Sequence, residues 1–362
     1  MKIKLKNTPE QVELVKAMGS RDITVAREAS EAFAAFIGPV VSKVLMQAGT
    51  ASAIYNDAPY DQDDSPSLPL DLWNDQGGQD YVTVWSQNVA GGLPSSAVEG
   101  FSELKISTYS LDAAVSFLKR YARRGRIDVV SKAVERMSNE VLVKQERNAW
   151  AVILKALAEA RTPGTGSGAL VTNGHIVGTD TPGAFGLADL NKLMTLVKRL
   201  NTSYAGGTTS DAYGLTDIFV SPEVKADVRA FAYQPFTSAN PGTNLPDSAR
   251  EEIYRNAGAQ ELYGVTIHEL VELGANAKYN ALFNAFKGSY NFNSNADELA
   301  IGVDLSREGF IRPIARNSDT GSTFSVLPDD QFAARSEKTG FYGSLEEGRV
   351  CIDARTVVGI KI

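Results

Sequence analysis

The sequence has very little of the material from which catalytic centres and covalent links are built. Its 362 residues include one cysteine, Cys351, and two histidines, His175 and His268. One cysteine excludes an internal disulfide, and two histidines argue against a histidine-based metal or catalytic centre. Neither a G-x-S-x-G nucleophile elbow nor a G-x-x-x-x-G-K-[ST] phosphate loop occurs. The sequence therefore predicts no enzymatic activity and no cofactor, and we interpret Cys351 and His268 as strand residues.

Long apolar runs are also missing. No window approaches the roughly 18 uninterrupted apolar residues that a membrane helix needs. The N-terminal residues M-K-I-K-L-K run into N-T-P-E without an apolar core. We therefore expect neither a membrane partner nor a secretory signal.

Basic residues are outnumbered by acidic ones. The chain has 36 Lys and Arg against 43 Asp and Glu, which gives a net charge of −7. This balance argues against a protein whose main role is to coat nucleic acid. A hydrophobic content of 43% with 22% charged residues is typical of a folded globular protein. The length predicts two lobes or one large elaborated unit.

Lysine and arginine are absent from residues 55–80, which instead contain seven aspartates and three prolines. Proline stiffens a chain and like charges repel, so we interpret this segment as an extended arm. Residues 81–85 and 103–109 then have the composition of strands, and they flank the glycine- and proline-rich turn 90–96. The two runs predict a long hairpin without a core of its own.

Local signals predict most of the helices. Thr8-Pro9-Glu10-Gln11 forms a capping box, and Gly19 is a stop signal. The predicted helices are 8–19, 24–48, 128–161, 187–200, one that begins after Ser221, and 247–256. Pro39 predicts a kink or break in the second of them. The helix 128–161 would be about 50 Å long. The predicted later strands are 217–221, 264–270, 299–305, 311–316, 332–342 and 349–362.

Two short patterns resemble ligand-binding motifs, but the residues around them do not fit those motifs. Residues 164–169 satisfy the dinucleotide pattern G-x-G-x-x-A, but a helix precedes them where the motif needs a strand, so we interpret them as a linker. Asp61-x-Asp63-Asp64 resembles the start of a calcium loop, but Pro66 and Leu72 stand where an EF-hand needs glycine and glutamate. A looser calcium site, and with it a calcium-dependent binding module, remains an alternative of lower rank.

One short segment is strongly basic. Residues 119–126 read K-R-Y-A-R-R-G-R. One interpretation is a contact with phosphate, and the other is salt bridging to the acidic surface of another segment or subunit. The aspartate-rich arm is an obvious complementary partner, so we favour the second interpretation.

Several stretches resemble the major capsid proteins of tailed bacteriophages, whose fold is named after phage Hong Kong ninety-seven. The residues that carry the resemblance are 85–94 (W-S-Q-N-V-A-G-G-L-P), 107–122 (S-T-Y-S-L-D-A-A-V-S-F-L-K-R-Y-A), 128–130 (D-V-V), 139–150 (N-E-V-L-V-K-Q-E-R-N-A-W), 334–341 (A-R-S-E-K-T-G-F) and 350–362. The resemblance spans most of the chain and depends on the order of the elements as well as on these runs.

The resemblance implies an α+β capsid fold with five parts. They are an N-terminal arm (1–80), an extended loop (81–110), a peripheral domain with a spine helix (111–164), an axial domain (165–290) and the return strands of the peripheral domain (291–362). It implies a structural protein that builds hexamers and pentamers of an icosahedral head around double-stranded DNA. The residues expected to act between subunits are Trp85, Gly91, Gly92, Leu93, Pro94, Arg120, Arg123, Arg124 and Arg126.

The resemblance also implies a setting. The protein would be found in the virion, and in the host cytoplasm during assembly, with the portal as a partner and with separate scaffold and cement proteins left open. DNA would be enclosed without sequence-specific binding. No lysine lies between residues 81 and 104, so we expect none of the isopeptide links that a loop lysine forms in some members. The alternative with the same fold is an encapsulin-type shell around a protein cargo.

Overall fold

The computed structural model describes residues 8–47, 49–62, 64–69, 103–160, 174–200, 214–231, 248, 251, 255, 261–288, 290–306, 308–317, 322–329 and 337–362. The chain divides into two compact units. The first unit contains Met1–Pro66, Lys105–Ala149 and Ile311–Val350. The second unit contains Ser67–Leu104, Trp150–Phe310 and Cys351–Ile362. The prediction of five parts stays a prediction.

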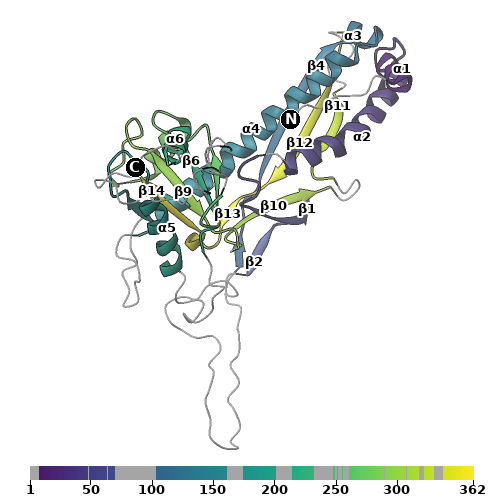
Figure 1. Cartoon of the computed structure of the whole chain (residues 1–362). Coiled ribbons are helices and arrows are strands. Elements are labelled where there is room, and N and C mark those ends of the chain that lie inside the picture. The colour runs from purple at the N-terminus through teal and green to yellow at the C-terminus, as the bar shows by residue number, and fades with distance from the viewer. Residues whose placement is uncertain are drawn as a thin grey trace, which may run out of the picture. The chain divides into compact units, whose positions relative to one another are not determined.

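The first unit packs helices against a sheet (Figure 1). Its helices are α1 (Pro9–Met18), α2 (Ile23–Gln47), α3 (Lys119–Arg123) and the first part of α4 (Ile127–Glu159). Its strands are β1 (Asn56–Asp61), β4 (Tyr109–Leu118), β10 (Phe310–Arg316), β11 (Ser325–Asp329) and β12 (Lys338–Glu347). Strand β12 is the centre of the sheet, because β4, β11 and the end of β10 all pair with it in antiparallel fashion.

Aromatic side chains join the layers of this unit. Phe33 of α2 lies with its ring centroid 5.4 Å from that of Phe341 on β12. Phe117 of β4 lies 6.2 Å from Phe341 on the same sheet. All three are buried, together with Val130 and Val134 from the first turns of α4. The predicted amphipathic pattern of the long helix is thus what anchors it to the sheet.

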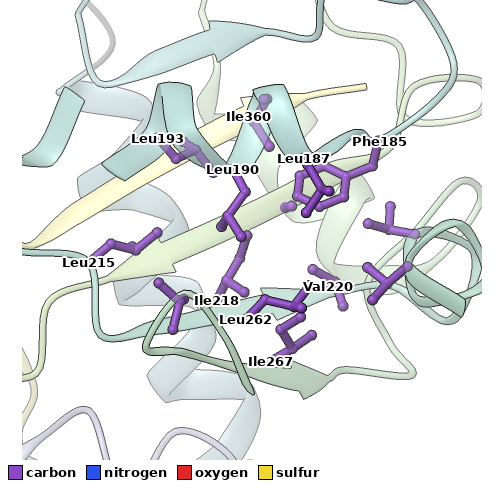
Figure 2. Close-up of a cluster of buried hydrophobic side chains, with 14 of the residues drawn as sticks. Phe185, Leu187, Leu190, Leu193, Leu215, Ile218, Val220, Leu262, Ile267 and Ile360 are labelled. Carbon is purple, nitrogen blue, oxygen red and sulfur yellow. The ribbon is translucent and has the colours of Figure 1, made fainter. Parts of the chain in front are cut away.

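The second unit is built on a mixed sheet of six strands in the order β5-β14-β9-β6-β8-β7. These strands are β5 (Ile176–Gly178), β6 (Asp217–Val220), β7 (Glu261–Leu262), β8 (Val265–Glu269), β9 (Leu299–Val303) and β14 (Val357–Lys361). Its helices include α5 (Leu187–Leu200), α6 (Pro222–Ala230) and α8 (Lys278–Phe286). Figure 2 shows leucines of α5 meeting β-branched residues of the sheet in one apolar cluster. Strand β13 (Val350–Cys351), where the chain passes from the first unit to the second, pairs with β10 of the first sheet. The second unit also contains the 3-10 turn Ala354–Thr356.

The end of α4 is buried in this second unit through Trp150. Its indole is fully buried, 4.9 Å from the ring of Phe219 on β6 and 5.8 Å from the ring of Tyr279 on α8. The contact with Phe219 is edge-to-face, which is a favourable arrangement for two aromatic rings.

Strong local signals were good predictors. Helices α1, α4 and α5 lie where the sequence placed them. The side chain of Ser221 caps α6 by accepting a hydrogen bond of 3.2 Å from the backbone amide of Val224. The predicted helix 247–256 falls largely outside the described residues. Helix α8 and strand β11 were not predicted.

Three expectations were wrong in detail. The predicted break at Pro39 does not occur, because helix α2 continues through this residue, and the predicted kink stays a prediction. The strand predicted at 332–342 is β12 at Lys338–Glu347. The aspartate-rich segment begins as a true sheet strand, since β1 pairs in parallel with β10.

Gly343 lies at a position in the first sheet that has no room for a larger side chain. A Cβ at this position of β12 would lie 2.4 Å from the ring of the buried Phe324. We expect Gly343→Ala to lower the free energy of unfolding by about 1–3 kcal/mol, the usual cost of overpacking. The control is Gly178→Ala in β5, where a new Cβ meets nothing within 4 Å. Urea unfolding of both variants measures the difference, and equal losses would contradict the prediction.

Candidate interaction surfaces

The predicted extended loop is closed at its base. Strand β2 (Ser67–Pro69) pairs with β3 (Glu103–Lys105), so the residues that flank 70–102 on either side lie next to each other. The predicted pairing of 103–109 with 81–85 stays a prediction, because 81–85 lie outside the described residues. The residues expected in the loop lie outside the described residues: Trp85, Gly91, Gly92, Leu93 and Pro94.

The predicted basic residues gather at the turn between α3 and α4. Residues 119–128 contain five basic side chains and one acidic side chain, Asp128. Gly125 makes this turn possible, since its φ of 64° lies in the left-handed region that favours glycine. Lys16 of α1 lies against the same glycine, which adds a further positive charge. We call residues 119–126 with Lys16 the basic corner.

The four arginines of the basic corner are not equivalent. The Nε of Arg123 donates to the carbonyl of Gly19 at 2.7 Å, which ties α3 to the end of α1. The guanidinium of Arg120 lies 5.1 Å from the ring centre of Tyr121. Arg124 and Arg126 are exposed and have no carboxylate partner in the part of the chain that the structure describes. These two side chains are therefore the ones available to another molecule.

One aspartate of the aspartate-rich segment forms an ion pair within the first unit. Asp57 of β1 receives two hydrogen bonds of 2.6 Å from Arg312 of β10, whose side chain is almost fully buried. This bidentate pair holds β1 to the sheet. Asp61 and Asp64 are exposed beyond it. The sequence could not reveal this pairing, because the partners are 255 residues apart.

A buried ion pair that the sequence did not indicate lies at the end of β12. The side chain of Glu347 is 0% exposed and that of Arg349 is 4% exposed, with 3.2 Å between them. Tyr109 donates to Glu347 at 2.8 Å and Gln145 at 3.0 Å. Burial, followed by the negative charge of Glu347, raises the pKa of Tyr109 to about 12, so this hydroxyl stays a donor. We call these four residues the Glu347 network.

The apolar side chains of α2 form a second surface that the sequence did not single out. The helix buries one face in the first unit, yet Phe36 and Val40, which flank that face, are 49% and 44% exposed. The available signal was the run of ten uncharged apolar residues at 32–41, which reads as buried on all sides.

The cysteine and the two histidines, which are side chains able to take part in catalysis, lie in partly or fully buried positions where they make structural contacts. Burial raises the pKa of the Cys351 thiol to about 12, so it is protonated at neutral pH and a poor nucleophile. His268 of β8 lies 2.6 Å from Asp217 of β6 and stacks on Phe219, which joins the two neighbouring strands. Burial lowers the pKa of His175, whose Nδ1 lies 3.0 Å from the carbonyl oxygen of Val357.

Ligand-sized sites are not evident in the described ranges. A cavity of about 60 Å³ in the first unit is lined mainly by hydroxyl and amide side chains and by Glu346. It has room for a few waters, whereas organic ligands occupy several hundred Å³. Within those ranges, no group of three or more His, Cys, Asp or Glu could hold a metal ion. The same part of the chain contains no helix long and apolar enough to span a membrane.

Solved structures align with this chain at low sequence identity. Neither the family models nor the curated proteins match the chain. The capsid chain of an empty GTA particle aligns with a TM-score of 0.50 at 15% identity, over 85% of this chain and 88% of that one. A chain of Microbacterium phage Oxtober96 gives 0.50 at 11% identity, over 87% and 90%. The SrpI encapsulin of Synechococcus elongatus gives 0.38 at 12% identity, over 72% and 75%.

The sequence resemblance and the structural comparison thus agree on architecture. Two of these matches reach a TM-score of 0.50 and cover at least 85% of both chains. The chain therefore has the α+β fold of the major capsid proteins of tailed bacteriophages.

Proposed function

We propose that this chain is a major capsid protein, a structural subunit that assembles into hexamers and pentamers of an icosahedral head around double-stranded DNA. The observation that carries the proposal is the alignment with a capsid chain along 85% of this sequence. Such coverage includes both compact units and therefore concerns the whole chain.

The surfaces of the first unit support a protein that works with copies of itself. Arg124 and Arg126 carry charges without carboxylate partners in the described ranges, and the outer side of α2 exposes large apolar side chains. A neighbour that covers it would account for the exposed apolar surface, and the exposed charges could select that neighbour through complementary charge. In a closed shell, each weak contact is repeated at every equivalent interface.

The enclosed DNA would be held loosely. A net charge of −7 on each chain makes the average interaction with phosphate repulsive unless basic residues face inward. DNA would then be kept in place by the closed shell, with entry through a portal at one vertex. Separate scaffold and cement proteins are compatible with the proposal but not required by it.

Electron microscopy of the purified chain tests the proposal directly. We expect negatively stained closed particles when the chain is produced alone or with its neighbouring genes, and nuclease-resistant DNA inside particles from infected cells. Particles that contain a protein cargo and no protected DNA would support the encapsulin alternative instead. A chain that stays monomeric under all conditions would contradict both shells.

The predicted extended loop should be needed for closure and not for folding. Deleting residues 88–97 leaves the paired strands β2 and β3 at the base intact. We expect a soluble subunit with an unchanged urea midpoint and at least tenfold fewer closed particles, because the loop is proposed to bind a neighbour. A same-length Gly/Ser replacement should also fail, which separates loop length from loop side chains. Normal particles from either variant would contradict the assignment.

A further inference from the structure

Helix α2 carries exposed apolar side chains next to the face that it buries. Its inner side packs Phe33, Ile37 and Val41 into the core of the first unit. Its outer side exposes Phe36 and Val40 to solvent. A helix that is apolar all round is normally covered all round, so the outer side calls for a second layer of protein.

The exposed residues of the outer side share one broad face of the helix, about 140° wide. At about 100° per residue, positions spaced by three, four and seven residues share a face. We call these residues the α2 stripe: Glu28, Ala32, Ala35, Phe36, Pro39, Val40 and Lys43, all of them exposed. Alanine and proline at three of these positions would let a second helix approach closely.

The two ends of the α2 stripe carry opposite charges. Glu28 is at one end and Lys43 at the other, about 22 Å apart at 1.5 Å per residue. Neither side chain has an ion-pair partner among the residues that the structure describes. Nearby Arg27 and Glu31 are, in contrast, paired with each other at 2.9 Å. The stripe thus offers an acidic end, an apolar middle and a basic end.

We propose that the α2 stripe binds the α2 stripe of a second copy of this chain in an antiparallel, two-fold arrangement. With the axis between Ala35 and Phe36, residues whose numbers add up to 71 face each other. Glu28 of each copy then faces Lys43 of the other copy, and Ala32 faces Pro39. A two-fold contact forms each pair twice. A partner with a single sign of charge would leave one end of the stripe unmatched.

This inference goes beyond the proposed shell, because a two-fold contact requires only two chains. Disulfide trapping tests it with or without particles. In a Cys351→Ser background, Ala35→Cys places a thiol beside the axis, so mild oxidation should give a linked dimer on a non-reducing gel. The matched control is Glu28→Cys, whose two thiols would lie about 22 Å apart and should link at least tenfold less. Equal linking, or none at Ala35→Cys, would overturn the proposal.

Charge reversal tests the register. Glu28→Lys or Lys43→Glu places like charges at both ends, so each variant alone should associate about three- to tenfold more weakly at low salt. A mixture of the two variants should recover, because every facing pair is then opposite in sign. Sedimentation of the full chain below the concentration that forms particles measures this.

Other occupants of the stripe give a different result. If the loop 70–102 of a neighbour covered it, Ala35→Cys would not link to itself and the mixed variants would not recover. That result would overturn the two-fold pairing while leaving the shell proposal standing. A chain that forms no particles but still links through Ala35→Cys would contradict the shell proposal and support the two-fold pairing.

Discussion

Replacing Arg349 with alanine is expected to lower the free energy of unfolding of the first unit by about 3–5 kcal/mol. The reason is the environment of Glu347, whose side chain is 0% exposed and lies 3.2 Å from the guanidinium. Removing the arginine leaves a buried charge with only the neutral donors of Tyr109 and Gln145. Burial opposes the charge of Arg349, but the neighbouring Glu347 outweighs burial and raises the pKa of the guanidinium, which therefore stays charged.

The chain contains a natural control for this experiment. Arg355 pairs with Asp353 at the same two-residue spacing, but the side chains are 23% and 16% exposed. We expect Arg355→Ala to cost only about 1 kcal/mol, because water can replace the lost partner. The double variant Glu347→Gln with Arg349→Met should recover most of the loss, since no buried charge remains. Equal losses for Arg349→Ala and Arg355→Ala in urea unfolding would refute this account.

The sequence predicted helices and strands better than it predicted contacts between distant residues. A capping residue, a helical period or a proline at the first turn acts within a few residues, and α1, α5 and α6 were accordingly predicted. The pairing of Asp57 with Arg312 depends on residues 255 apart in sequence. Without that partner, the aspartates of residues 55–80 predict only repulsion and an extended arm. The fold supplies the partner, and Asn56–Asp61 becomes a strand.

The candidate surfaces were predicted to the extent that charge reveals them. The basic corner was found because five basic side chains in eight residues stand out in any environment. The outer side of α2 was not found, because exposure is decided by which side of a helix the core takes. Phe33 and Phe36 are chemically identical and three residues apart, yet one is 2% exposed and the other 49%. Only the position of the sheet distinguishes them.

Reversing the charges of Arg124 and Arg126 to glutamate is expected to leave the subunit folded and to stop assembly. Both side chains are exposed and have no carboxylate partner in the described part of the chain, so unfolding should change by less than about 0.5 kcal/mol. Each surface contact contributes only about 0–1 kcal/mol, but a closed shell repeats it at every equivalent interface. We expect at least tenfold fewer particles at low salt, counted by electron microscopy.

Salt and a third arginine separate the possible reasons for such a loss. If the new glutamates repel acidic surface on a neighbour, about 0.5 M salt should restore part of the assembly, since it shortens the screening length to a few Å. Arg123→Ala is the control, because Arg123 already donates to the carbonyl of Gly19 within its own unit. Its loss should cost about 1 kcal/mol of stability and leave particle numbers unchanged. Normal assembly of the Arg124→Glu/Arg126→Glu variant at low salt would mean that the basic corner faces solvent. Acidic side chains of a neighbour would then have no part in recognising it.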